Sequence, residues 1–123
     1  MKAKDANQLR IGNWIYDKQV GIRSEFKVTA GDILDIEAGD ENEYCFEQLI
    51  EYWLVKFNYK YNKKEEYWES PNGFKLWNSG TKLKPEFYHI NSELLIHLNY
   101  VHHLQNLEFD LTGEELTIKT QIT

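Results

Sequence analysis

Two adjacent histidines, His102 and His103, are the side chains best suited to chemistry, because imidazole can bind a metal or transfer a proton. They lie in the segment YVHHLQNLEFDLTGEEL, residues 100–116. Successive residues of an α-helix are about 100° apart, so the two rings are expected to diverge. Neither histidine has another three or four residues away, as an HExxH-type zinc site requires. The pattern favours ordinary surface or half-buried histidines over a metal or catalytic site, and a polar or partner-facing stripe of His103, Asn106 and Asp110 stays open as an interpretation.

The spacing of apolar residues predicts an amphipathic helix over residues 101–112. Its apolar face is formed by Val101, Leu104, Leu107 and Leu111. Gly113 then supplies a left-handed C-terminal cap. Phe109 lies opposite the leucines, so it must either touch a second layer of the fold or stay exposed for a partner.

Catalytic chemistry has no specific support elsewhere in the chain. Cys45 is the only cysteine, which excludes an internal disulfide and favours a reducing compartment. It lies among glutamates that oppose thiolate formation, so a structural role is favoured over a nucleophilic one. His89 and His97 match no catalytic motif, and no GxSxG, Walker or GxGxxG motif occurs. We therefore expect a protein that is not an enzyme and that needs no metal or cofactor.

An acidic segment is the strongest charge feature. No Lys or Arg occurs between Val28 and Val55, whereas eight acids do. They are Asp32, Asp35, Glu37, Asp40, Glu41, Glu43, Glu47 and Glu51. The DxDxDG spacing of a calcium loop is absent. Two interpretations remain open, a solvated face and a surface that docks onto a basic partner.

In contrast to the acidic segment, the stretch NYKYNKK is basic and aromatic. It interleaves Tyr59 and Tyr61 with three lysines, a combination that could stack on single-stranded nucleic acid. Its two neighbours, Glu65 and Glu66, and the formal net charge of −6 oppose binding to a phosphate backbone. Direct nucleic-acid binding is therefore the weaker interpretation.

Length and composition predict a single globular domain over residues 1–123, with residues 1–8 as a flexible leader. Hydrophobic residues make up 41% of the 123 residues and aromatic residues 15%, enough for a substantial core. The first ten residues are polar and no apolar run approaches the roughly 18 residues of a membrane span. We expect a protein that is neither secreted nor embedded in a membrane.

The periodicity of the sequence predicts an α+β fold. Residues 9–36 alternate as three or four short strands with Gly and Asp turns. Residues 41–57 have helical periodicity, with Asp40 and Glu43 spaced as a capping box. Short aromatic strands follow, then a strand in SELLIHLNY. The expected architecture is a small antiparallel β-barrel or curled sheets packed with two amphipathic helices, about 41–57 and 101–112.

Two segments, LRIGNWIY and YVHHLQNLEFDLTGEEL, resemble paired signatures of small uncharacterised proteins encoded by bacterial genomes, prophages and phages. The late segment there commonly reads YVHQLQNLYFALTGEEL, so His103, Glu108 and Asp110 make this chain more charged. The resemblance covers about a fifth of the chain and brings no catalytic residues with it.

The setting that the resemblance implies is a phage or mobile-element accessory gene. Small acidic proteins of that setting often act by stoichiometric binding, as inhibitors of RNA-guided bacterial immunity do. The expected function is a cytoplasmic, anti-CRISPR-like inhibitor that binds a bacterial defence protein, with the basic RNA-handling surface of a CRISPR nuclease as its target. The alternatives are a nucleic-acid-binding accessory module and a phage structural or housekeeping protein. The candidate interface comprises the acidic segment and His103, Phe109 and Asp110.

Overall fold

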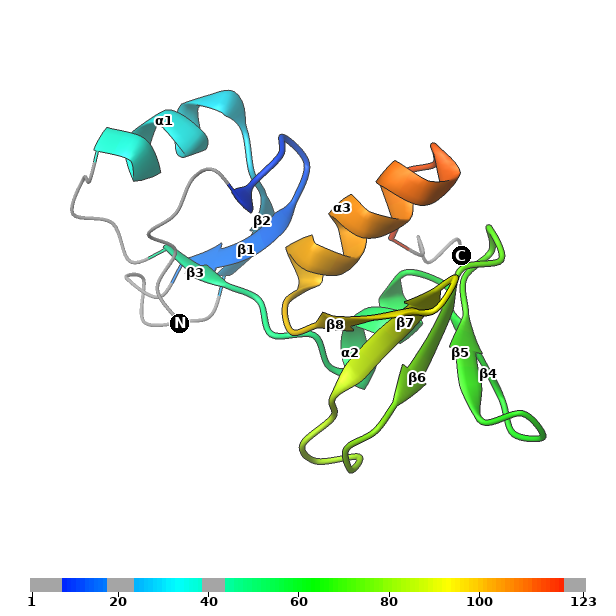
Figure 1. Cartoon of the computed structure of the whole chain (residues 1–123). Coiled ribbons are helices and arrows are strands. Elements are labelled where there is room, and N and C mark those ends of the chain that lie inside the picture. Colours follow the sequence, from blue (N-terminus) through cyan, green and yellow to red (C-terminus); the bar gives the residue numbers. More distant parts are fainter. Residues whose placement is uncertain (1–7, 18–23, 39–43, 119–123) are drawn as a thin grey trace, which may run out of the picture. The chain divides into compact units, whose positions relative to one another are not determined.

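The computed structural model describes residues 8–17, 24–38 and 44–118 (Figure 1). Within these ranges the chain is α+β, with three helices and two antiparallel sheets. The helices are α1 (Ala30–Ala38), α2 (Glu51–Lys56) and α3 (Val101–Thr112). The strands are β1 (Trp14–Asp17), β2 (Ser24–Lys27), β3 (Tyr44–Phe46), β4 (Lys60–Asn62), β5 (Tyr67–Glu69), β6 (Lys75–Asn78), β7 (Phe87–Asn91) and β8 (Leu94–Leu98). The predicted fold class is confirmed, with open curled sheets and not a closed barrel.

The chain divides into two compact units. The first comprises Met1–Gln48 and Tyr100–Asn106, and the second comprises Leu49–Asn99 and Leu107–Thr123. Helix α3 therefore contributes its first half to one unit and its second half to the other. The organisation of residues 1–123 as one domain stays a prediction.

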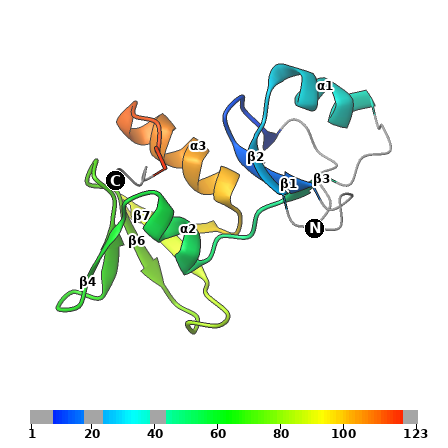
Figure 2. The same ribbon diagram turned by 180° about the vertical axis from the view of Figure 1, so that it is seen from behind.

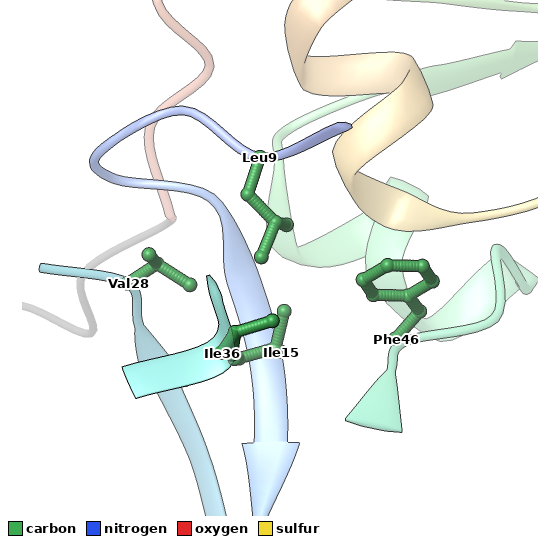
Figure 3. Close-up of a cluster of buried hydrophobic side chains, with 5 residues drawn as sticks. All are labelled: Leu9, Ile15, Val28, Ile36 and Phe46. Carbon is green, nitrogen blue, oxygen red and sulfur yellow. The ribbon is translucent and has the colours of Figure 1, made fainter. Parts of the chain in front are cut away.

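The first unit is built on a three-stranded sheet in the order β2-β1-β3. Ile15 on β1 pairs with Phe26 on β2 and with Phe46 on β3. Figure 3 shows how Leu9, Ile15, Val28, Ile36 and Phe46 converge on a common core. All five side chains are buried, so this sheet has one face in the core, as alternating strands require.

The second unit contains a five-stranded meander in the order β4-β5-β6-β7-β8, which confirms the predicted run of aromatic strands. Helix α2 lies beside one face of this sheet in both views (Figures 1 and 2). Trp53 and Leu54 of the helix and Leu76 of β6 are fully buried. The predicted strand in SELLIHLNY is β8, but Leu94 and Leu95 are exposed and only Leu98 is buried.

The segment after Val28 is a helix, which corrects the strand predicted around Ile33 and Ile36. Helix α1 begins with a capping box, in which Oδ2 of Asp32 accepts hydrogen bonds of 2.9 Å from the backbone N–H and the hydroxyl of Thr29. The backbone N–H of Asp32 in turn donates to Oγ1 of Thr29. The predicted strand alternation of Val20 and Ile22 lies outside the described residues.

The helix predicted over residues 41–57 is wrong in its first half. Tyr44–Phe46 form β3, and the helix itself covers only Glu51–Lys56, after an extended Ile50. Long-range backbone pairing replaces helical bonding in between, because the N–H of Leu49 donates to the carbonyl of Asn99. The predicted capping residues Asp40 and Glu43 lie outside the described residues.

Helix α3 has the predicted bounds, and Gly113 caps it with a φ of 75° and an N–H donated to the carbonyl of Phe109. Its buried face differs from the predicted leucine face. Leu104 is buried, but Leu107 is half-buried and Leu111 is 45% exposed. The fully buried positions are Val101, His102, Leu104, Gln105 and Glu108. The described part of the chain holds no helix long and apolar enough to cross a membrane.

Candidate functional site

The acidic segment does not form one continuous surface. On α1, the side chains of Asp35 and Glu37 are exposed, with Leu34 beside them at 63% exposure. Asp32 has a structural role at the start of the helix and also accepts a hydrogen bond from the Tyr44 hydroxyl. Burial first, and then the charge of Asp32, raise the pKa of Tyr44. Among the described acids of the segment in this unit, Asp35 and Glu37 are the exposed ones.

The remaining acids of the segment divide into three cases. Glu47 is fully buried, so the prediction that it belongs to a partner-facing surface is wrong. Its backbone carbonyl accepts a hydrogen bond from the N–H of Val101. Glu51 opens helix α2 in the second unit and is half-buried. Asp40, Glu41 and Glu43 lie outside the described residues.

The two histidine rings lie together, with ring centroids 4.5 Å apart, and do not diverge as predicted. Their Nε2 atoms are 3.1 Å (His102) and 3.4 Å (His103) from Oε1 of Gln8. His102 is buried against Phe46, at a centroid distance of 4.4 Å, so it does not belong to the outer side of the helix.

Burial chiefly, with repulsion from His103, lowers the pKa of His102 to about 3. Burial also lowers the pKa of His103. Both rings are therefore neutral near pH 7 and fill space beside aromatic side chains. Among the described residues, no three side chains of His, Cys, Asp or Glu gather as metal ligands.

Glu108 is a buried carboxyl group in the second unit. Its Oε1 accepts a 2.5 Å hydrogen bond from the hydroxyl of Tyr59, and its Oε2 accepts one from Nδ2 of Asn72. Burial raises the pKa of Glu108, although these hydrogen bonds oppose the shift. Burial and the nearby carboxylate raise the pKa of Tyr59 well above its usual range. Because neither side chain is open to solvent, the pair joins structural elements and offers no substrate site.

The burial of Tyr59 removes one of the two rings expected to stack on nucleic acid. Tyr61 is exposed, so the stretch NYKYNKK keeps one of the two rings that its pattern offers for base stacking. Cys45 is buried on β3, where a free thiol packs as a small apolar group. On α3, Phe109 is 36% exposed and Asp110 is exposed, so both remain candidates for partner contact.

A pocket of about 540 Å³ in the second unit was not predicted from the sequence. Its aromatic lining consists of Tyr61 (β4), Trp68 (β5), Trp77 (β6) and Tyr88 (β7). The rings form two pairs, because the Tyr61 and Trp68 centroids are 5.2 Å apart and Trp77 stacks on Tyr88 at 6.0 Å. The ring of Tyr61 is exposed and the other three rings are half-buried, so the open pocket has flat aromatic surfaces for a ligand.

Charged groups surround these rings. Glu51, Glu65 and Glu66 line the pocket, with Lys82 as the one lysine in the lining. Within the described residues, no ion pair or side-chain hydrogen bond neutralises the three carboxylates. The pocket therefore combines aromatic faces with an excess of negative charge.

Local hydrogen bonds fix the walls of the pocket. In the β4–β5 turn, Oδ1 of Asn62 accepts from the backbone N–H groups of Lys64 and Glu65. In the β6–β7 loop, Oδ1 of Asn78 accepts from the N–H groups of Gly80 and Glu86. A Cβ on Gly80 would clash with the carbonyl oxygen of Lys84, so the close approach of the loop requires glycine.

No protein-family model, curated protein or solved structure matches this chain.

Proposed function

We propose that this chain is a non-enzymatic accessory protein of a phage or mobile element that binds and inhibits a bacterial defence protein in the host cytoplasm. The target that its charge fits best is the basic, RNA-handling surface of an RNA-guided nuclease, which would make the chain an anti-CRISPR. The observation that carries the proposal is the pair of exposed carboxylates on α1, Asp35 and Glu37, which flank the exposed Leu34.

The physical argument is charge complementarity around a small apolar contact. Exposed acids attract a basic surface over a distance of about one Debye length, roughly 8–10 Å in physiological salt. An exposed leucine among them loses water on docking and adds apolar contact area. The formal net charge of −6 acts in the same direction and raises the encounter rate with a basic partner.

The ionisable groups best placed for catalysis serve the fold instead. His102 is neutral and packed against Phe46, and Glu108 is buried and bonded to Tyr59. These placements support a binding function over an enzymatic one.

The test combines capture with a functional assay. The tagged chain is used to capture proteins from a lysate of a bacterium that carries RNA-guided immunity, and it is also expressed there during infection by a targeted phage. We expect capture of the nuclease and restored plaque formation, with both effects reduced by Asp35→Asn combined with Glu37→Gln. Unchanged plaque formation and no captured defence protein would contradict the proposal. Capture of virion proteins alone would favour the structural alternative.

A further inference from the structure

The pocket in the second unit lies on different elements from α1 and has no part in the contacts proposed above. We infer that it receives the guanidinium group of an arginine on a basic peptide segment of the partner. This inference rests on the proposed function, because it takes the partner to have a basic surface. It names the chemical group of the partner that this pocket would bind.

The chemistry of the pocket selects a cation. A positive group over an aromatic face is attracted by the negative charge of the π-system, and the Tyr61–Trp68 pair in the lining offers such a face. The carboxylates of Glu65 and Glu66 line the same pocket and attract the same charge. Nucleic-acid bases also stack on such rings, but their phosphates would be repelled by the carboxylates.

The shape of the pocket favours arginine over lysine. Guanidinium is planar, stacks on aromatic rings and forms paired hydrogen bonds with a carboxylate, whereas ammonium is a compact and strongly hydrated charge. The flat indole of Trp68, beside the ring of Tyr61, suits a planar group. The volume of about 540 Å³ falls within the roughly 300–1,000 Å³ that is common for small-ligand pockets. It leaves room for the backbone on either side of one arginine.

One feature of the pocket acts against a cation, because Lys82 also lines it. Three glutamates against one lysine still leave an excess of two negative charges. Lys82 is exposed on the β6–β7 loop, so its ammonium group can turn towards solvent when a ligand cation enters.

The experiment is an NMR titration of the whole chain with the peptide acetyl-Gly-Arg-Gly-amide. We expect saturable shifts of the indole N–H signals of Trp68 and Trp77, with a millimolar dissociation constant. The signals of the other tryptophans, Trp14 and Trp53, should stay in place. The matching lysine peptide should bind more weakly, and the peptide with neutral citrulline should bind weakest.

Two charge variants are compared in the same titration. Glu65→Gln with Glu66→Gln should weaken binding about five- to tenfold. The matched control is Glu93→Gln with Glu114→Gln, which removes two exposed carboxylates of the same unit outside the pocket and should leave binding unchanged. Equal weakening by both pairs would reduce the effect to net charge and overturn the inference.

Two further outcomes would overturn it. One is equal affinity for the arginine and citrulline peptides. The other is unchanged affinity of the wild-type chain between 50 and 500 mM salt, roughly the range over which exposed charges become screened, and this arm needs no folded variant. If the peptide does not bind, and partner capture is still reduced by Asp35→Asn with Glu37→Gln, the pocket inference is wrong and the proposed function is supported. If the peptide binds but no defence protein is captured, the arginine pocket is supported and the proposed function is contradicted.

Discussion

At the scale of single residues, His102 determines how the first unit responds to acid. Its ring is buried beside Phe46 and Tyr100, and burial holds its pKa near 3, below the usual value of 6.5. The unfolded chain therefore binds a proton below pH 6.5 that the folded chain does not. Stability from this group is complete above pH 6.5 and is lost as the pH falls towards 3.

We expect the free energy of unfolding to fall by about 1.4 kcal/mol for each pH unit below 6.5 through this one group. Chemical denaturation at a series of pH values measures the slope. His102→Gln should lower stability at pH 7 but flatten the slope below it. The same substitution at the exposed His97, His97→Gln, is the matched control for the change of side chain. A wild-type curve that is flat between pH 6.5 and 5 would contradict this account.

Glu108 has the opposite effect on how the free energy of unfolding depends on pH, so its contribution is separated by a variant of its own. Burial raises its pKa above 4.5, so the folded chain holds this proton more tightly than the unfolded chain does. Its contribution to stability is therefore greatest below pH 4.5 and declines as the pH rises through the raised pKa. Glu108→Gln should remove that opposing trend and make the loss of stability in acid steeper.

The sequence alone did not predict these buried polar side chains. The leucine spacing predicts the inner face of α3, but Gln105 is buried as well, and Gln105 and Asn106 bond to other residues of the first unit. Oε1 of Gln105 accepts from the backbone N–H of Trp14, and Oδ1 of Asn106 accepts from Nε of Arg10. Hydrophobic periodicity cannot reveal such a face, because its partners lie about ninety residues away.

At the scale of elements, local signals and long-range pairing explain what was right and wrong. The meander β4–β8 was predictable because each strand has its own turn residues. Phe46, Leu49 and Trp53 are buried as their spacing predicted, but they come from a strand, an extended link and a helix. The bridge between Gln48 and Tyr100 is a contact that a local window cannot contain.

Two hairpin turns hold a side-chain-bearing residue in the left-handed region, Glu66 at φ 58° and Ser92 at φ 57°. This conformation costs a residue other than glycine about 1–2 kcal/mol. A substitution by glycine removes this cost, but the greater conformational freedom of glycine in the unfolded chain cancels part of the gain. Glu66→Gly and Ser92→Gly should each raise the free energy of unfolding by about 0.5–1 kcal/mol. Chemical denaturation of both variants is the measurement.

The pair also separates backbone strain from function. Glu66 lines the pocket and Ser92 does not, so only Glu66→Gly should weaken binding of the arginine peptide. A loss of stability in both variants would show that the turns do not carry the strain that their φ angles indicate.

At the scale of the whole molecule, the candidate binding features are collected from distant parts of the chain. The residues that line the pocket come from α2, from four strands and from two connecting loops, so no single sequence motif could predict it. The sequence shows the cluster of acids in the predicted docking segment, but it does not show which of them are exposed. The fold buries Glu47, uses Asp32 as a cap and leaves Asp35 and Glu37 exposed. Charge can be counted from the sequence, whereas its exposure depends on packing.

The most direct test of the central claim is the association rate of the chain with its captured partner, at low and at high salt. Exposed carboxylates contribute little to folding but act on encounter at long range, so Asp35→Asn with Glu37→Gln should keep the melting temperature of the wild type. The account predicts that this variant associates several-fold more slowly at low salt and that its rate depends less on salt. Equal association rates and equal salt dependence of variant and wild type would contradict it.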